Sequence, residues 1–599
     1  MADPRDLEKI LTALPMSRRL LLKRAALLGA TVPVVGTLLA ACEDDDTDDD
    51  VADDIDDDEP AVDTDDTDDV ADTDDDDEPV DDTDDDEPAD DADDVDDDDR
   101  YGGEIVILGH HEIESLSPDD RGPTVHWAMI TNIHDGLVAI DWHYEIEHEL
   151  AHDYEVTDDG MEYTFHLEEG VMFHDGEEFT AEDCVYNFEF HMDEDNATVL
   201  GGDYTAIDSV EAVDDYTFVV NMSETDASFL RRAAKNEIVA AHHHEEIGED
   251  NYKSDPIGTG PFMVEDYSPA EFCRLAAFED HWRGRPYVDY LTEEIIPEGS
   301  VRTLQLQTGE AHSIVWPPVI DDDLELEEDP DFDSYVVPTL SLNHFPLNNQ
   351  HEVLSDVAVR QAMLYATDRD QVIDDVFLGA ATKATANLAP TLEPFYNPDV
   401  KEYPYDPEMA EEVLEEAGWE LNGNGIRERD GVECHFVCTA ITGDEARLPE
   451  AEVVQQYLAA VGIDMEIQEA PLATIQEGQR DGTIDASLYN WTYGGTDGEP
   501  DGTATLHSTA RNNWNLWEND RVDELLNLGL LEVDEDDRVP IYHEIQEIVA
   551  EEAPMLFMMY WDWFQHWSVN VQGRPDTDDL LSTGSTLIRY IRDFYLVED

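Results

Sequence analysis

Residues 150–188 read L-A-H-D-Y-E-V-T-D-D-G-M-E-Y-T-F-H-L-E-E-G-V-M-F-H-D-G-E-E-F-T-A-E-D-C-V-Y-N-F, and this stretch decides the fold class. An alternating apolar segment predicts a strand that ends at Leu167, and E-E-G and H-D-G then have the composition of turns. Thr180 can cap a helix that begins at Ala181, with acidic residues in its first turn. Strand, turns and helix in this order predict a mixed α/β protein.

The same mixture continues through the rest of the chain. Residues 101–599 are too many for a single hydrophobic core, so we expect two or three lobes. Asp406 precedes Pro407 at a helix start, and Gly418 supplies the corresponding stop. Strand signals lie at 103–108, 163–167 and 216–220, and helix signals lie at 181–190, 357–368 and 407–417. This mixture predicts α/β lobes.

The sequence predicts an N-terminal export signal over residues 1–42. Arg18 and Arg19 stand in S-R-R-L-L-L-K, and the apolar stretch 25–41 is short and rich in small residues. This pattern resembles a twin-arginine export signal, and L-A-A-C at Cys42 resembles a lipobox. We therefore expect lipidated Cys42 to anchor the protein on the outer face of the cell membrane. An ordinary basic and apolar signal with a chance cysteine is the alternative.

An acidic segment, residues 43–99, follows the signal directly. About two-thirds of its residues are Asp or Glu, so it cannot build a core. As a coil at high salt it would span about 40 Å end to end. We interpret it as a disordered tether, with an acidic tail that binds calcium or a partner as the alternative.

The whole chain is strongly acidic. Asp and Glu number 151 against 30 Lys and Arg, which gives a formal net charge of −121. Such a surface repels nucleic acid and anionic headgroups, so we expect neither partner, and membrane contact is expected through the lipid alone. Scarce Lys with excess acid resembles proteins of salt-loving archaea. The fold is predicted to loosen in dilute buffer, where surface carboxylates repel one another most strongly.

Four cysteines remain after Cys42, too few and too scattered for a disulfide framework. Cys184 and Cys273 have the surroundings of small buried hydrophobes. Cys434 and Cys438 lie in an alternating segment, where residues i and i+4 of a strand stand about 13 Å apart. A disulfide needs Cα atoms within about 7 Å, so we expect the pair to stay unbridged, and a C-H-x-x-C metal site is the weaker reading.

Collinear motifs across nearly all of residues 101–599 resemble family 5 extracellular solute-binding proteins, the dipeptide, oligopeptide and nickel receptors of ABC importers. The resemblance begins with the opening stretch and covers the chain in order. The further segments are P-I-G-T-G-P-F (256–262), H-W-R-G-R-P-Y-V-D (281–289), E-I-I-P-E-G-S-V-R-T-L-Q-L-Q-T-G-E (294–310), D-V-A-V-R-Q-A-M-L-Y-A-T-D-R (356–369), Y-P-Y-D-P-E-M-A-E-E-V-L-E-E-A-G-W (403–419) and W-E-N-D-R-V-D-E-L-L (517–526).

The resemblance implies a two-lobed periplasmic-binding-protein-like fold of type II, with an extra inserted domain and the solute between the lobes. It predicts a first lobe from residues 103–137, 262–342 and 558–599, an inserted domain at 138–261, and a second lobe at 343–557. It further implies a monomeric receptor without enzymatic activity or cofactor. Its partners would be a peptide or other small solute and the permease and ATPase subunits of an importer.

The segment S-L-Y-N-W-T-Y-G-G-T-D-G-E-P-D, residues 487–501, falls where the peptide receptors of the family bind the α-ammonium group of a peptide. Trp491 matches the family tryptophan, and Asp497 is predicted to be the amine-binding carboxylate, with Tyr493 as a further aromatic contact. A carboxylate and aromatic rings on a glycine-rich loop suit a cationic, partly apolar solute. The spacing after Trp491 is about two residues longer than in the dipeptide receptors, and Asn490 replaces a glycine, so a turn-capping role for Asp497 stays open.

Three other predicted solute contacts follow from the resemblance. Ser115 and Leu116 fall on the first cleft loop of the family. Asn348 falls at the asparagine of the family's phenylalanine-asparagine pair, with Leu347 in place of the aromatic, and a role in tying the hinge is favoured there over contact with solute. Leu472 stands where peptide receptors often carry a tryptophan, so the solute need not be a dipeptide.

Several motifs admit interpretations of other classes. Three adjacent histidines at 242–244 would point in different directions on a helix, so no metal site is predicted there. N-G-N-G at 422–425 indicates a hairpin rather than a calcium loop. The aromatic run at 560–567 predicts a core strand near the hinge. An exported hydrolase is the chief rival function, but the chain lacks G-x-S-x-G, H-E-x-x-H and a phosphate-binding G-x-x-x-x-G-K motif. A surface adhesion protein would explain the anchor and tether alone. A receptor for a metal chelate, sugar or amine is the alternative within the family.

Overall fold

The computed structural model describes residues 100–120, 127–193, 195–196, 198, 200–314, 320–442, 444, 447–493, 498–575 and 591–597. All of them belong to one unit of the chain, residues 92–599. The predicted signal with Arg18, Arg19 and Cys42, the acidic tether and Asp497 lie outside the described residues.

A large mixed sheet contains strands from distant parts of the sequence. Its order is β20-β12-β21-β11-β1-β10-β9-β8, and β13 pairs with β21 beside this path. Strand β1 runs parallel to both β10 and β11, whereas β12 and β21 are antiparallel. The strands are β1 (Glu104–Gly109), β8 (Phe262–Ser268), β9 (Phe272–Ala277), β10 (Tyr290–Ile295), β11 (Ser313–Ile314), β12 (Phe332–Pro346), β13 (Ala381–Lys383), β20 (Tyr489–Trp491) and β21 (Met555–Ser568).

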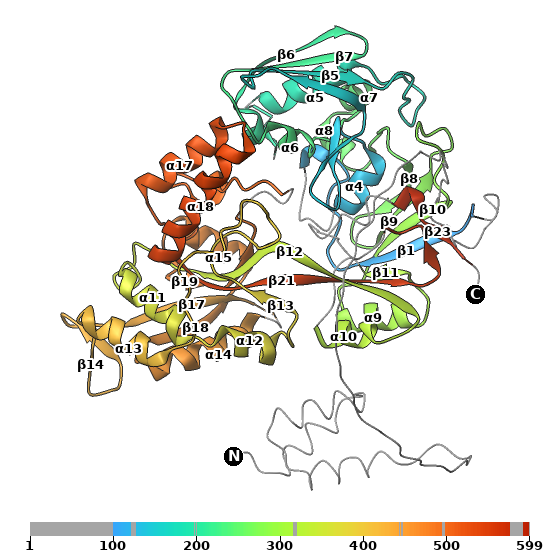
Figure 1. The fold of residues 1–599 in the computed structure, drawn as a ribbon. Helices are drawn as coiled ribbons and strands as arrows, with labels where there is room; N and C mark the ends of the chain where they lie inside the picture. Colours follow the sequence, from blue (N-terminus) through green and yellow to red (C-terminus); the bar gives the residue numbers. More distant parts are fainter. Residues whose placement is uncertain are drawn as a thin grey trace, which may run out of the picture. The chain divides into compact units, whose positions relative to one another are not determined.

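Strands β12 and β21 are long, and each contributes to two different cores. They run side by side in Figure 1, and their register shifts between the pairs Pro338–Asp562 and Leu342–Tyr560. On one side of this shift, Val337 packs into a core with strands β1, β9 and β10. On the other side, Leu342 packs into the largest core of the chain. The register shift therefore lies between the two hydrophobic cores.

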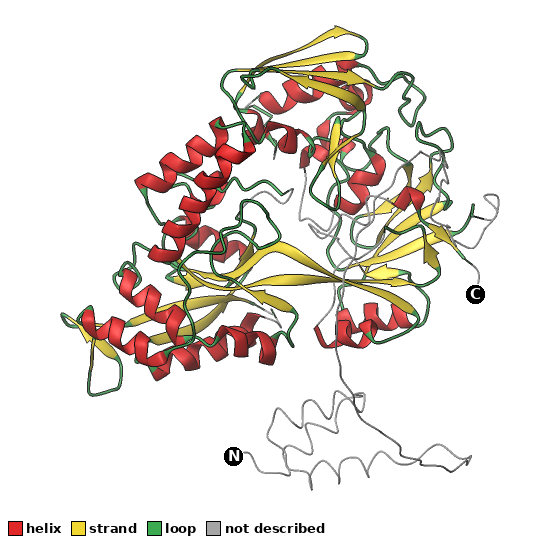
Figure 2. Cartoon of the chain, viewed as in Figure 1, coloured by secondary structure: helices red, strands yellow, loops and turns green. Residues whose placement is uncertain are grey.

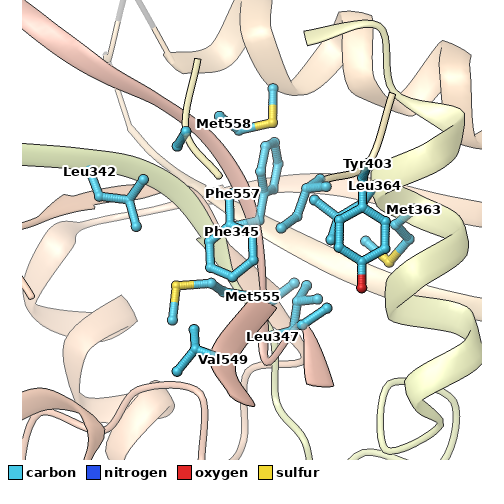
Figure 3. Packing of buried hydrophobic residues seen from close by; sticks show 14 of the residues in the cluster. Leu342, Phe345, Leu347, Met363, Leu364, Tyr403, Val549, Met555, Phe557 and Met558 are labelled. Atoms are coloured by element: carbon cyan, nitrogen blue, oxygen red, sulfur yellow. The ribbon is translucent and has the colours of Figure 1, made fainter. Parts of the chain in front are cut away.

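The largest core surrounds the second half of β12 and β21. Figure 3 shows Phe345 and Leu347 of β12 and its extension beside Met555 and Phe557 of β21, with Met363 from a covering helix. The helices of this part are α11 (Val357–Ala366), α12 (Arg369–Val376), α13 (Pro407–Glu416), α14 (Arg447–Ala460), α15 (Leu472–Arg480), α16 (Thr503–Leu506), α17 (Asp520–Leu531) and α18 (Glu535–Glu552).

A second, smaller sheet in this part has parallel strands. Its order is β18-β17-β19, and both outer strands run parallel to β17. The strands are β17 (His435–Ile441), β18 (Asp464–Ala470) and β19 (Ala486–Ser487), and a bridge between Leu347 and Ala486 ties them to the end of β12. Helices α14 and α15 connect these strands, so this is an α/β unit.

The opening stretch of the sequence folds into a separate four-stranded sheet of order β4-β5-β7-β6. Phe165 of β5, Phe188 of α5 and Phe218 of β7 meet in its core, at 5.0 Å between the last two rings. Figure 2 shows this sheet and its helices. Its elements are β4 (Ala151–Val156), β5 (Glu162–Leu167), α5 (Ala181–Met192), β6 (Ile207–Asp214), β7 (Thr217–Met222), α6 (Phe229–Ala233), α7 (Ala241–Ile247) and α8 (Glu249–Tyr252).

Short elements complete the described part. They are η3 (Pro118–Asp120), α4 (Trp127–Ile133), β2 (Val138–Ile140), β3 (Ile146–His148), η5 (Gly201–Tyr204), α9 (Gly299–Gln307), α10 (Ile320–Glu327), β14 (Glu420–Leu421), β15 (Arg427–Arg429), β16 (Val432–Glu433), β22 (Val571–Gln572), η6 (Ile591–Asp593) and β23 (Tyr595–Leu596). Among the described residues, no helix combines the length and the apolar character needed to cross a membrane.

Local predictions from the sequence are confirmed at several points. The carboxylate of Asp183 accepts a hydrogen bond from the backbone N–H of Thr180 at 3.0 Å, so helix α5 begins as predicted. Asp406 caps α13 by accepting from Met409 N–H at 2.9 Å, and N-G-N-G joins the hairpin of β14 and β15. The four cysteines in the described residues are buried and free. The predicted α/β class is confirmed.

Candidate solute-binding site

Three aromatic rings form a compact group beside strand β20. Trp514 lies 4.7 Å from both Tyr489 and Trp491, between ring centroids, with interplanar angles of 63° and 58°. Trp491 pairs with Leu342 of β12, so it stands on a strand and not on the glycine-rich loop where the sequence placed it. We call Tyr489, Trp491 and Trp514 the aromatic group. Trp514 is only 4% exposed, so it supports the partly exposed rings of Tyr489 and Trp491, which can pack against an apolar or aromatic portion of a solute.

The aromatic group follows directly after the carboxyl ends of parallel strands. Strands β17 and β18 end at Ile441 and Ala470, and β19 ends at Ser487, two residues before Tyr489. In open α/β sheets, ligands bind outside this edge. Leu472, which opens helix α15 after β18, is 38% exposed. The topology therefore brings the aromatic group and the first turn of α15 to the edge where a solute is expected.

The other face of β20 is fixed by Arg447 of α14. Its guanidinium donates two hydrogen bonds to the side-chain oxygen of Asn490, at 2.8 and 2.6 Å, and it also pairs with Asp444. The guanidinium carbon lies 5.0 Å from the ring centre of Trp561 on β21. Asn490, which replaces the expected glycine, thus connects the strand that carries Trp491 to the helix below it. This makes β20 a rigid support for the aromatic group.

A buried carboxyl group continues the same polar layer. Glu450 of α14 accepts a hydrogen bond from the amide of Asn343 on β12, at 2.7 Å. Burial raises the pKa of Glu450 to about 8, and the hydrogen bond from Asn343 opposes this rise only in part. The group is therefore mostly neutral at pH 7, and it adds no full negative charge below the site.

The loop that would carry Asp497 re-enters the described residues at Gly498 and ends at Asp501. Glu499 is buried and pairs with Arg538 of α18 at 2.5 Å. Asp501 accepts hydrogen bonds from the N–H and the hydroxyl of Thr503, at 2.9 and 2.6 Å. These contacts attach the C-terminal end of the loop to helices α16 and α18.

The chain matches a known protein family over most of its length. Residues 145–513, more than half of the chain, match the middle region of bacterial extracellular solute-binding proteins, family 5. The chain belongs to this family. A family 5 protein acts outside the cytoplasm as a solute receptor and not as an enzyme, so the hydrolase alternative loses its support.

Similar proteins are known by sequence and by structure. Heme-binding protein A of Haemophilus influenzae is 30% identical over 460 residues, 72% of this chain and 81% of that protein. The dipeptide-binding protein of Escherichia coli K12 is 30% identical over 452 residues, 71% of this chain and 82% of that protein. The periplasmic binding protein DppA of Helicobacter pylori, in complex with peptide STSA, has a TM-score of 0.71 and 25% identity, over 83% of this chain and 99% of that chain.

These matches confirm the predicted two-lobed α/β fold of the family 5 receptor. The long strands β12 and β21 each contribute to two of the cores of this fold. Solute binding between lobes follows from the same fold.

Tyr493 and Asn348 both take part in internal hydrogen bonds of the receptor. The hydroxyl of Tyr493 lies 2.8 Å from Nε2 of His344 and accepts from Asn515 at 3.3 Å. Asn348 donates to the carbonyl of Gly482 at 3.1 Å, which ties the end of β12 to the turn after α15. Their direct contact with solute stays a prediction.

Ser115 and Leu116 lie in the loop after β1, at the carboxyl edge of the first sheet of the receptor. The Ser115 hydroxyl accepts from Ser117 N–H at 3.1 Å, and the Leu116 side chain is fully buried in the core beside β1. Leu116 N–H donates to the carbonyl of Lys253 at 2.8 Å. Side chains of this loop therefore fix its shape, and its role in solute binding stays a prediction.

The three adjacent histidines of the receptor point to three different partners. His242 lies 2.7 Å from the carboxylate of Asp175, and His243 lies 2.9 Å from the carbonyl of Asp255. His244 lies 2.6 Å from the hydroxyl of Tyr186. Neighbouring residues of a helix project about 100° apart, so the three side chains diverge, as the sequence indicated.

Sequence reasoning missed Tyr489, Trp514 and Arg447 as parts of the site. Trp514 lies in W-N-L-W, where no periodicity distinguishes a site residue from a core residue. A search for aromatic residues near the family tryptophan would have found Tyr489, but the contact with Trp514 depends on tertiary packing.

Proposed function

We propose that this receptor binds a short peptide with a free amino terminus and an apolar or aromatic side chain, and delivers it to the permease of an ABC importer. The observation that carries the proposal is the aromatic group at the carboxyl edge of β17, β18 and β19. Aromatic rings accept an apolar side chain, and the predicted carboxylate of Asp497 would pair with the amino group.

Relatives support a peptide as the solute. One is named a dipeptide-binding protein, and a similar structure holds the peptide STSA. Heme-binding protein A is equally similar by identity, so haem is the first non-peptide solute to test.

The experiment is thermal melting of the purified receptor in molar KCl with Phe-Leu, N-acetyl-Phe-Leu, haem or Ni²⁺. A ligand that binds only the folded state raises the melting temperature according to RT ln(1 + [L]/Kd). We expect Phe-Leu to raise it and N-acetylation to remove most of the effect, because the acetyl group abolishes the cationic amine. A shift with haem or Ni²⁺ and none with Phe-Leu would overturn the peptide assignment.

The attachment to the membrane belongs to the same proposal. The twin arginines Arg18 and Arg19 would direct export, lipidated Cys42 would anchor the chain, and residues 43–99 would tether it near its permease. The acidic composition fits an organism that lives in concentrated salt. Replacing Cys42 by Ser should move the receptor from the membrane fraction into the medium, and retention in the membrane would refute lipidation.

The lobe boundaries are part of this proposal too. The four-stranded sheet falls within the predicted inserted domain, 138–261, and the largest core falls mostly within the predicted second lobe, 343–557. Strand β21 crosses the boundary predicted near residue 558, which supports placing the hinge along this strand.

A further inference from the structure

Arg232 connects two acidic residues that lie far apart in the sequence. Its side chain, on the short helix α6 of the predicted inserted domain, donates to Asp226 at 3.0 Å and to Asp501 at 2.9 Å. Asp226 belongs to the same domain, whereas Asp501 ends the segment 487–501 of the predicted second lobe. One guanidinium therefore joins the inserted domain to the loop that begins after the aromatic group.

Both aspartates are positioned before Arg232 reaches them. One oxygen of Asp226 accepts from the N–H of Ser228 at 3.0 Å, and one oxygen of Asp501 is held by Thr503. In each case the second oxygen pairs with Arg232. Because turns fix the carboxylates, little conformational entropy is lost when the ion pairs form.

We call the contacts between the predicted inserted domain and the predicted second lobe the seam. Besides the ion pairs of Arg232, two further contacts belong to it. Ala227 N–H donates to the carbonyl of Leu530 on α17 at 2.8 Å. Gly498 lies so close to Tyr144 that a Cβ built on it would stand 2.6 Å from the Tyr144 Cβ. The positive φ of Gly498, +80°, also favours glycine there. The seam thus fixes both ends of the segment 498–501 and one end of α17.

The burial of the three charges suits a reversible contact. The side chains of Arg232, Asp226 and Asp501 are 17%, 4% and 9% exposed. If the seam opened, Arg232 would keep Asp226, and Asp501 would keep Thr503 while it gained water. Separating a buried ion pair is costly when it leaves a buried charge without a partner. Opening of the seam leaves no such charge.

We propose that Arg232 is a positioning residue that holds the 498–501 segment against the inserted domain in the closed receptor, and that it thereby raises the affinity for solute. The proposal rests on the proposed solute-receptor function. Solute binding selects the closed state, so each contact made only in that state increases the closed population and the apparent affinity. Arg232 itself need not contact the solute.

The test compares Arg232→Gln and Asp501→Asn with Arg521→Gln, by calorimetric titration of Phe-Leu in molar KCl. Arg521 is a matched control because it also bridges two acids, Glu524 and Glu544, but both lie on the α17 and α18 helices of one lobe. We expect Arg232→Gln and Asp501→Asn each to raise the Kd for Phe-Leu by about fivefold or more, within the usual range of coupling between sites. Arg521→Gln should leave Kd unchanged.

Two further measurements separate positioning from general damage. Arg232→Lys keeps a cation and should recover part of the affinity, and the double variant should lose no more than either single variant. Without solute, small-angle X-ray scattering should show a larger radius of gyration for Arg232→Gln than for Arg521→Gln.

Unchanged Kd in both seam variants, or an equal loss in the Arg521 control, would overturn the proposal. This result is distinguishable from failure of the peptide assignment, in which the wild-type receptor itself would not bind Phe-Leu.

Discussion

Glu293 of β10 packs its carboxyl group directly against Gly109, the last residue of β1. A Cβ on Gly109 would overlap this carboxyl group. Glu293 is only 1% exposed, and burial raises its pKa to about 8. The predicted cleft loop with Ser115 begins directly after Gly109. A mostly neutral, buried acid therefore supports the start of that loop.

The first prediction concerns the pH dependence that Glu293 imposes. Its folded pKa of about 8 lies above the ordinary 4.5, so between these values the folded state keeps a proton that the unfolded state releases. The free energy of unfolding must therefore fall as pH rises through this window. Glu293→Gln should increase it by roughly 2–4 kcal/mol near pH 8 and change it little near pH 4.5. Denaturant unfolding in molar KCl measures the free energy of unfolding at both pH values, and Glu294→Gln on the same strand is the control. Equal effects at the two pH values would contradict the buried, protonated state.

The second prediction concerns the space at Gly109. Gly109→Ala should lower the free energy of unfolding by about 1–3 kcal/mol, because the new methyl group forces Glu293 or β1 to move. Gly423→Ala is a suitable control, since a Cβ there meets nothing within 4 Å. Denaturant unfolding of the two variants gives the difference. Equal stabilities would show that Glu293 can move aside at no cost.

The third prediction tests the aromatic group. Trp491→Ala should weaken the binding of Phe-Leu by about tenfold or more, because it removes a partly exposed ring face from the proposed apolar contact. Trp514→Ala should also weaken binding, because the buried Trp514 ring supports Trp491. Tyr405→Ala removes an exposed ring elsewhere in the second lobe and should leave the affinity unchanged. Calorimetric titration, with melting curves to verify folding, measures the effect. If Tyr405→Ala weakens binding as much as the tryptophan variants, the group is not the solute site.

The fourth prediction follows from the net charge of −121. The melting temperature should rise steadily from dilute buffer to molar KCl, because added ions screen the repulsion among surface carboxylates. Near-ultraviolet circular dichroism at a series of KCl concentrations measures the transition. A fully native spectrum and an unchanged melting temperature at low salt would remove the argument for salt adaptation.

Sequence reasoning succeeded where the structure depends on neighbouring residues. Thr180 and Asp183 determine the start of α5, and Asp406 with Pro407 determines the start of α13. It could not find contacts that depend on the path of the whole chain. Arg232 and Asp501 are 269 residues apart, and no local pattern of charge connects them.

The candidate site shows the same division. Trp491 was found because a motif marks it, but its ring partner Trp514 comes from a segment beyond the loop. Asn490 departs from the family pattern. Its bond to Arg447, which gives the departure a structural reason, depends on how α14 packs beneath β20.

Strand β21 also determines when the chain can finish folding during synthesis. Its residues 555–568 pair with β12, β11 and β13, and they supply Met555 and Tyr560 to one core and Trp567 to another. A ribosome must therefore complete almost the entire chain before either core can close. A truncated polypeptide would expose unpaired β12 edges and apolar side chains, which are sites at which unfinished chains aggregate.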